Sequence, residues 1–351
     1  MTSDNKDKPN LEDTFAAEAT ISTRKPLDSV KPTEMDNPSV LSNKDSTKSS
    51  KLDNPPAQTK KPRSDPPPEL IPIPGYTFID SLYESKRTIV FRAREEQSGR
   101  DVALKQFKDQ KEFDREKEIQ KLLTNSGSDR ENLLLADRFL DEQRTTISPY
   151  LRGGDLYNLP KVVGKLKPRH TWVIALDLLD GLQVMHDQGI LHRDVKSRNV
   201  LVDITNPKIE KITAENLESF VDLNFKLCDY EFAKYQNIED QDEEGKVIGT
   251  HRYIDPELWL GGRYDPRSDI YGAGIILYRL LAGQYPIDGE DKHQVIQRQI
   301  RDSIPDLTQF NQDVTPGQKA VLEKVLAKKP KDRYQSAQEF KCDWMAELIR
   351  K

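Results

Sequence analysis

Cysteine is scarce in this 351-residue chain, which contains only Cys228 and Cys342. Two cysteines cannot build the disulfide framework that stabilises small secreted domains. No run of apolar residues approaches the ~18 that a membrane-spanning helix requires, and the segment from Met1 to Lys6 lacks the apolar core of a signal peptide. We therefore expect a soluble protein of a reducing compartment, the cytoplasm.

An excess of positive charge is also missing. The formal net charge is −5 at pH 7, and the sequence pI is about 5.7. Domains that bind nucleic acids usually carry a strongly basic surface, so we expect no nucleic-acid partner. At 351 residues the chain exceeds one average domain, which makes one large domain, or two small ones, with tails the starting expectation.

The first 70 residues contain little that could form a core. They hold ten prolines and one aromatic residue, Phe15, among many Ser, Thr, Asp and Lys. Such a segment buries too little apolar surface to offset the conformational entropy lost on ordering. We predict that residues 1–70 form a disordered tail, whose prolines between Pro55 and Pro68 act as an extended spacer.

Past residue 70 the pattern changes, first to strands and then to helices. Three β-rich runs separated by polar turns are found at residues 76–79, 88–93 and 101–105. After Gly153 and Gly154 the chain becomes mainly helical, and residues 270–281 are apolar enough to form a helix buried on nearly all sides. This order predicts an α+β fold with a β-rich lobe, residues 71–151, a helical lobe, residues 152–351, and a site between them.

The most informative segment is residues 191–201, with the sequence LHRDVKSRNVL. It places an acid, a cation and an amide at fixed offsets: Asp194, Lys196 and Asn199. Phosphoryl transfer needs this set, because a carboxylate accepts the hydroxyl proton, a cation offsets the phosphoryl charge and an amide binds a metal. The alternative, a charged turn that merely faces solvent, is disfavoured because partner motifs follow in the right order.

From about residue 75 to its end, this order of motifs resembles a eukaryotic-type protein kinase of the serine/threonine class. The resemblance implies that Asp194 is the catalytic base and that Lys196 neutralises the transferring phosphoryl group. It also implies that ATP and Mg²⁺ are bound, with Asn199 and Asp229 as metal ligands. A protein substrate would supply the hydroxyl.

By the same resemblance, Lys105 grips the α- and β-phosphates of the nucleotide. Its partner would be a glutamate of a helix on which Phe113, Ile119 and Leu123 recur. Glu116 fits the spacing better, and Glu118 is the alternative. The other expected nucleotide contacts are Val90, Ala103 and Leu201 around adenine, Pro149 and Leu151 in the hinge, and Asp155 at the ribose.

Residues 249–257, with the sequence GTHRYIDPE, resemble the end of an activation segment. Thr250 is expected to hydrogen-bond Asp194 and Lys196, which is a mark of the serine/threonine class. Two buried polar struts are also expected: Glu257 with Arg333, and Asp269 beneath the catalytic loop.

The loop that covers the phosphates departs from the family pattern, which has three glycines there. Alignment on Val90 places Tyr83, Ser85 and Thr88 at the three glycine positions. Glycine lets a backbone approach phosphate closely, so some backbone contacts should be lost. The hydroxyls of Ser85 and Thr88 are expected to replace part of them.

Three further departures concern the middle of the chain. Glu231 replaces a flexible glycine after the metal-binding aspartate, which should make this segment harder to flip. Gln120 lies where the helix usually offers an apolar side chain between the lobes, which favours Glu118 slightly, since its equivalent position is Leu122. Residues 203–222 form an insertion that we expect to be a surface excursion.

The activation segment lacks a usual phosphorylation site. No serine or threonine lies between Asp229 and Thr250, and Lys246 occupies the position where the family commonly carries its phosphate. We predict that no activating phosphate is needed. Either Glu243 or Glu244 offers Arg193 a permanent negative charge, or these acids form a solvated loop without a partner.

All groups expected to contact the reacting phosphoryl are present, which favours an active serine/threonine kinase. The glycine-poor loop is the main argument for the alternative, a pseudokinase that serves as a nucleotide-binding or scaffold module. A small-molecule kinase of related fold is a third reading, disfavoured by the intact segment 249–257.

Overall fold

The computed structural model describes residues 70–125, 131–213, 217, 222–236 and 247–349, all within one compact unit. The predicted tail, apart from Leu70, lies outside these ranges, as do Glu243, Glu244 and Lys246. Across the described ranges, none of the helices is both long enough and apolar enough to cross a bilayer.

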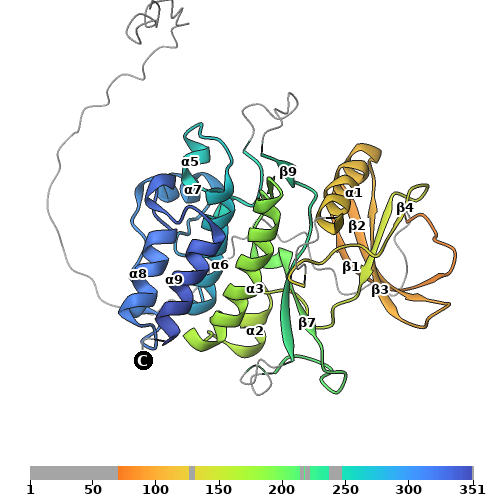
Figure 1. Ribbon diagram of the computed structural model, residues 1–351, viewed down its shortest axis with the longest axis horizontal. Coiled ribbons are helices and arrows are strands. Elements are labelled where there is room, and N and C mark those ends of the chain that lie inside the picture. Colours follow the sequence, from red (N-terminus) through yellow and green to blue (C-terminus); the bar gives the residue numbers. More distant parts are fainter. Residues whose placement is uncertain (1–69, 126–130, 214–216, 218–221, 237–246, 350–351) are drawn as a thin grey trace, which may run out of the picture. The chain divides into compact units, whose positions relative to one another are not determined.

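The first part of the described chain is a five-stranded antiparallel sheet (Figure 1), with strand order β1-β2-β3-β5-β4. The strands are β1 Tyr76–Glu84, β2 Thr88–Glu95, β3 Asp101–Phe107, β4 Arg138–Leu140 and β5 Thr145–Pro149. The three predicted β-rich runs fall inside β1, β2 and β3. Along β3 the side chains alternate between faces: Val102 and Leu104 are buried, whereas Ala103 and Lys105 are half-buried. Lys105 therefore projects from the opposite face of the sheet to the core residues.

Helix α1, Gln110–Asn125, follows β3 and carries the predicted glutamates. Its buried positions lie along one helix face, with each residue three or four from another: Phe113, Glu116, Ile119, Gln120 and Leu123. Two of these five are polar, so this face of α1 does more than fill a core.

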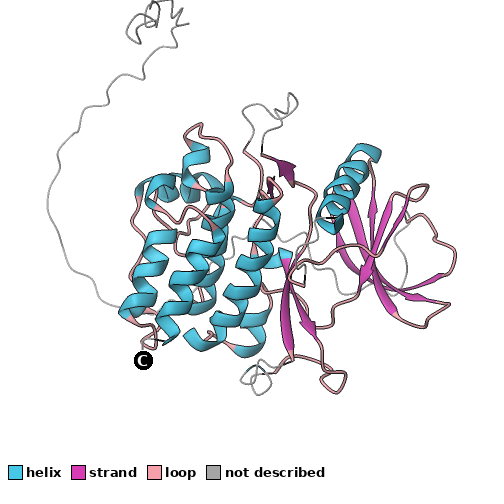
Figure 2. Cartoon of the chain, viewed as in Figure 1, coloured by secondary structure: helices cyan, strands magenta, loops and turns pink. Residues whose placement is uncertain are grey.

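The second part of the described chain is mainly helical (Figure 2), as predicted. Its helices are α2 Leu159–Val163, α3 Pro168–Asp187, α5 Pro256–Trp259, α6 Pro266–Ala282, α7 Lys292–Arg301, α8 Pro316–Val325 and α9 Ala337–Ile349. Contacts of α3 with α6 and α9 form the centre of this part. The predicted α+β order, a β-rich part followed by a helical part, is thus confirmed.

Helix α6 has clear start and stop signals around its buried body. Asp265 accepts a hydrogen bond from the Arg267 N–H at 2.8 Å, and Pro266 occupies the first turn, where its missing N–H is not needed. Gly283 ends the helix in a left-handed conformation, with φ of 76°. Every side chain from Ile270 to Tyr278 is buried, which confirms the prediction of a helix enclosed on nearly all sides.

Short strands between the two parts position the chemistry. Strand β6, Ile190–Leu191, pairs with β9, Lys234–Tyr235, and β7, Val200–Ile204, pairs with β8, Leu223–Leu227. The segment Asp194 to Asn199 therefore lies between β6 and β7, and Asp229 follows β8. Of the predicted insertion, residues 203–222, the first two belong to β7 and the rest connects β7 to β8, partly outside the described residues.

Candidate active site

The loop that carries Asp194 is hydrogen-bonded to Asp269 of helix α6. Both oxygens of Asp269 accept hydrogen bonds from this loop, from the His192 N–H at 2.8 Å and the Arg193 N–H at 2.9 Å. Arg193 adopts a left-handed backbone with φ of 64°, a conformation that costs free energy for a residue with a side chain. The buried carboxylate thus fixes the loop in one strained shape, as expected for Asp269.

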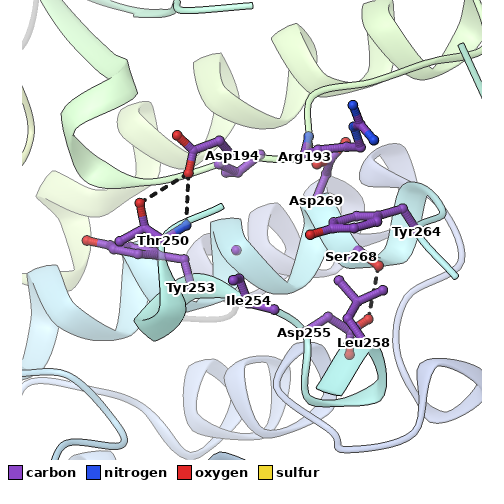
Figure 3. A pocket seen from close by; sticks show the side chains of 12 residues that line it. Arg193, Asp194, Thr250, Tyr253, Ile254, Asp255, Leu258, Tyr264, Ser268 and Asp269 are labelled. Carbon is purple, nitrogen blue, oxygen red and sulfur yellow. Dashed lines mark hydrogen bonds between the residues drawn. The ribbon is translucent and has the colours of Figure 1, made fainter. Parts of the chain in front are cut away.

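Asp194 is buried, and three side chains converge on it. Its Oδ1 accepts from both the N–H and the hydroxyl of Thr250, each at 3.1 Å (Figure 3), and its Oδ2 accepts from the Lys196 ammonium. The Asn199 amide nitrogen donates to the Asp194 backbone oxygen at 3.0 Å. Asp194 and Thr250 also line a pocket with Tyr253 and other residues of the activation segment and α6. Four residues predicted as functional therefore meet within hydrogen-bonding distance.

Lys105 joins the sheet to the second part of the chain. Its ammonium lies 2.6 Å from Glu116 Oε2 and 2.5 Å from Asp229 Oδ1. Glu118 is exposed on α1. Of the two candidate glutamates, Glu116 is thus the partner of Lys105 in this structure.

The charges of this cluster alter each other's titration. Burial alone would lower the pKa of Lys105, but the carboxylates of Asp229 and Glu116 outweigh it and raise that pKa. Burial would raise the pKa of Asp229, but Lys105 and Lys196 hold it low, at about 2. Asp229 is therefore ionised at any physiological pH. For Glu116, burial dominates over the nearby ammonium and raises the pKa.

Gln120 holds Glu116 in place, a role that sequence reasoning missed. Its side-chain N–H donates to Glu116 Oε1 at 2.9 Å, and its oxygen accepts from the Ala136 N–H at 2.7 Å. Gln120 is 4% exposed. Gln120, at a position expected to be apolar, therefore links Glu116 by hydrogen bonds to the chain segment before β4. The one available signal was its spacing, four residues after Glu116 on the same helix face.

The turn between β1 and β2 uses its hydroxyls internally. Ser85 Oγ accepts from the Thr88 N–H at 2.9 Å and the Arg87 N–H at 3.1 Å, and the Ser85 N–H donates to the Thr88 backbone oxygen at 2.8 Å. Thr88 is 1% exposed. Both hydroxyls therefore take part in hydrogen bonds that close the turn.

Tyr83 and Arg87, near the same turn, lie close to the catalytic residues. Partial burial raises the pKa of the Tyr83 hydroxyl, on which the charges of Lys196 and Asp229 also act. Arg87 forms an ion pair with Glu231. The sequence did not predict a role for Arg87, because its ion pair with Glu231 joins residues that are far apart in the chain.

The residues expected around adenine and ribose lie at the junction of the two parts. Val90, Ala103 and Leu201 are half-buried. Leu201 forms an isolated backbone bridge with Asp155. Pro149, expected in the hinge, is the last residue of β5 and pairs with Val102 of β3. Leu151, the other expected hinge residue, follows two positions later.

One predicted strut is wrong. Arg333 forms a two-pronged ion pair with Asp255, with both N–O distances 2.7 Å, and not with Glu257. Arg333 and Asp255 are each 2% exposed, whereas Glu257 is half-buried. The Asp255 carboxylate also accepts from the Ser268 hydroxyl and the Glu257 N–H, so it satisfies several buried donors at once.

Comparison with known proteins agrees with this geometry. The family described as the protein kinase domain matches residues 76–345. Relatives include the serine/threonine-protein kinase PknB of Mycobacterium leprae, 29% identical over 198 residues, and PknB of Mycolicibacterium smegmatis, 31% identical over 199 residues. A probable serine/threonine-protein kinase of Corynebacterium efficiens is 28% identical over 283 residues.

These relatives are much longer than the matched region. The two PknB alignments cover 56% of this chain and 29% of each relative, and the Corynebacterium alignment covers 76% of this chain and 40% of the relative. The chain thus spans less than half the length of the curated relatives it matches. Because the family match extends over most of the chain and the fold agrees with it, the chain belongs to the protein kinase domain family.

Proposed function

We propose that the protein transfers the γ-phosphoryl group of ATP to serine or threonine hydroxyls of a protein substrate, in the cytoplasm. The observation that carries the proposal is the state of Asp194. Its carboxylate is buried, bound by Lys196 and Thr250, and lies in the same part of the fold as the assembled Lys105–Glu116–Asp229 cluster. Residues 71–151 would form the lobe on the nucleotide side, and residues 152–351 the lobe that receives the substrate.

Each residue around Asp194 has a distinct task in this reaction. The Asp194 carboxylate would orient the substrate hydroxyl and accept its proton as the oxygen attacks phosphorus. Lys196, which already donates to the other oxygen of that carboxylate, would stabilise the negative charge on the transferring group. Thr250 fixes the rotation of the carboxylate through two hydrogen bonds to Oδ1.

The donor atoms on the nucleotide side fit a hard divalent cation. Asn199 uses its amide nitrogen toward Asp194, which leaves its oxygen as a ligand, and Asp229 has a second oxygen beyond the one bound by Lys105. Carboxylate and amide oxygens are the ligands that Mg²⁺ prefers. When bound, Mg²⁺ supplies positive charge that offsets the charge of the phosphates. Lys105 would hold the α- and β-phosphates beside it.

The alternative that the sequence left open is a pseudokinase, for which the glycine-poor loop is the main argument. The hydroxyls of Ser85 and Thr88 hydrogen-bond within their own turn. A binding module with this loop would hold nucleotide without transferring it.

Transfer of labelled phosphate from ATP to a generic protein substrate, with and without Mg²⁺, separates these candidates. The parent should transfer phosphate only with Mg²⁺. Asp194→Asn should lower kcat by about 10²-fold or more and leave ATP affinity intact. Asp229→Ala should remove Mg²⁺-dependent ATP binding. Parent protein that binds ATP with Mg²⁺ but never transfers phosphate would establish the pseudokinase instead.

A further inference from the structure

Three cations surround the aromatic ring of Tyr157, next to the catalytic loop. The guanidinium of Arg198 lies 3.9 Å from the ring centroid, that of Arg279 lies 4.6 Å away, and the ammonium of Lys161 lies 4.6 Å away. They come from the turn after Lys196, from α6 and from α2. Attraction to the ring face holds each cation near the same point. We call these four residues the Tyr157 cluster.

The Tyr157 cluster is only partly neutralised. Its one ion pair within the described part of the chain joins Arg198 to Asp155 at 3.6 Å, which is too long for a hydrogen bond. Arg279 donates to the Tyr157 backbone oxygen and Lys161 to the Asn158 side-chain oxygen, both uncharged acceptors. Three cations and one carboxylate leave two positive charges in excess, on a chain whose net charge is −5.

Arg252, which also lies over a tyrosine ring, has its charge neutralised and so offers a comparison with the Tyr157 cluster. Arg252 lies 4.9 Å from the ring of Tyr285, on which Arg279 also lies, at 5.2 Å. Unlike the Tyr157 cluster, Arg252 is 6% exposed and forms an ion pair with Asp288 at 2.6 Å. The excess positive charge therefore lies at the Tyr157 cluster and not around Tyr285, where Asp288 neutralises Arg252.

This excess charge begins beside the proposed catalytic base. Arg198 occupies the same short turn as Asn199, whose amide binds the backbone of Asp194. The Arg198 side chain is 30% exposed, and Lys161 is exposed. An extended peptide advances ~3.3 Å per residue. A peptide that presents its hydroxyl to Asp194 and runs along this side of the loop would bring a residue a few positions away to Arg198.

We propose that the Tyr157 cluster is a substrate subsite for carboxylate side chains, so that the kinase favours serines and threonines with aspartate or glutamate nearby. The inference rests on the proposed function and adds the substrate class. A guanidinium presents paired N–H groups that match a carboxylate, and the excess charge attracts acidic peptides and repels basic ones. The alternative is that the Tyr157 cluster has a structural role only and packs α2 and α6 against the catalytic loop.

A charge scan of a peptide substrate tests this inference on the full chain. Peptides with one serine and neutral flanks would carry a single Asp, Ala or Arg at each of four positions on either side, and kcat/KM would be measured for each. We expect Asp to exceed Arg about tenfold or more at one or two positions on one side. The difference should lie mainly in KM for the peptide.

Charge-reversal variants identify the residues responsible. Arg198→Glu and Lys161→Glu should each reduce the Asp-to-Arg ratio, and Arg198→Glu should bring it below one. Lys331→Glu, which makes the same charge change at an exposed lysine before α9, is the matched control and should leave the ratio unchanged. Because Lys161 is exposed, Lys161→Glu should fold and still test the subsite if Arg198→Glu fails to fold.

The outcomes separate this inference from the proposed function. If no peptide is phosphorylated at all, the proposed function fails. If peptides are phosphorylated regardless of flanking charge, or if the Asp preference survives both charge reversals, the kinase assignment stands and the acidic subsite is refuted.

Discussion

Arg87 and Glu231 join the two motifs that depart most from the family pattern, with Arg87 Nη1 3.1 Å from Glu231 Oε1. Arg87 lies in the turn that replaces the glycine loop, and Glu231 stands where the family has a glycine after the metal-binding aspartate. The same guanidinium lies 3.2 Å from Glu112 Oε1 on α1 and 4.9 Å from the ring of Phe232. One side chain therefore connects the turn between β1 and β2, helix α1 and the segment that follows Asp229, so the two departures act as a pair.

Breaking this connection should weaken nucleotide binding more than catalysis. The Arg87 side chain is 45% exposed, so solvent screening limits the coupling with Glu231 to about 0.5–1 kcal/mol. We expect Arg87→Ala to raise KM for ATP about three- to fivefold, because the covering loop loses its anchor, with kcat nearly unchanged. Steady-state kinetics at varied ATP measures both.

A double-mutant cycle assigns the effect to the pair. Glu231→Gln should raise KM for ATP similarly, and the double variant should be no worse than either single variant. Additive losses would show that Arg87 and Glu231 act independently, and the connection would then have no part in binding nucleotide.

The hydrogen bond from Gln120 to Glu116 should set the low-pH limit of activity. Glu116 must be ionised to pair with Lys105, so activity is lost as pH falls through its pKa, which burial raises. The Gln120 N–H stabilises the ionised form and opposes that rise. Gln120→Leu should therefore move the acid limb of kcat/KM upward by about one to two pH units, because a hydrogen bond to a charged group contributes about 1.5–3 kcal/mol.

Glu118→Gln is the matched control for this shift. It removes the alternative glutamate on the same helix, which is exposed, and should leave the pH profile unchanged. An unshifted profile in Gln120→Leu, or a shifted one in Glu118→Gln, would contradict the role given to Gln120.

The sequence predicted which residues meet at the candidate active site better than it predicted the contacts that support them. Residues 191–201 could be interpreted directly because Asp194, Lys196 and Asn199 lie close together in the chain and on one loop. The choice between Glu116 and Glu118 needed the rotation of α1, which two residues on one helix do not determine. Arg87 could not be found at all, since its partner Glu231 is 144 residues away.

The incorrect strut shows a second kind of limit. Asp255 and Glu257 are two residues apart, and either carboxylate can pair with an arginine. Burial decides between them, because Asp255 also satisfies the Ser268 hydroxyl, while Glu257 keeps access to solvent. The outcome depends on packing that no local pattern encodes.

This correction predicts unequal effects on stability. Arg333→Leu removes one partner of a buried pair and leaves the Asp255 charge without its main counterion, which should cost about 3–5 kcal/mol of unfolding free energy. Thermal unfolding should show a Tm lower by on the order of 10 °C. Glu257→Gln, in contrast, should change Tm by no more than about 2 °C. The reverse ranking would restore Glu257 as the partner of Arg333.

The active arrangement should need no phosphate on the activation segment. The Lys105–Glu116 pair and the Asp194–Thr250 hydrogen bonds are both formed by unmodified side chains. No serine or threonine lies between Asp229 and Thr250. Phosphatase treatment should therefore leave kcat unchanged, and intact-mass measurement would verify that the protein carries no phosphate.

The source of negative charge near Arg193 is tested separately. Its Nε donates to the Phe232 backbone oxygen at 2.7 Å, so the side chain points toward the start of the activation segment. Glu243 and Glu244, which lie outside the described residues, are the sequence candidates for a permanent counterion. If they serve Arg193, replacing both with Gln should lower kcat several-fold, because the ordering that phosphate gives to other activation segments would be lost. Full activity in that variant would favour a solvated loop, and activity that appears only after treatment with an upstream kinase would overturn phosphate independence itself.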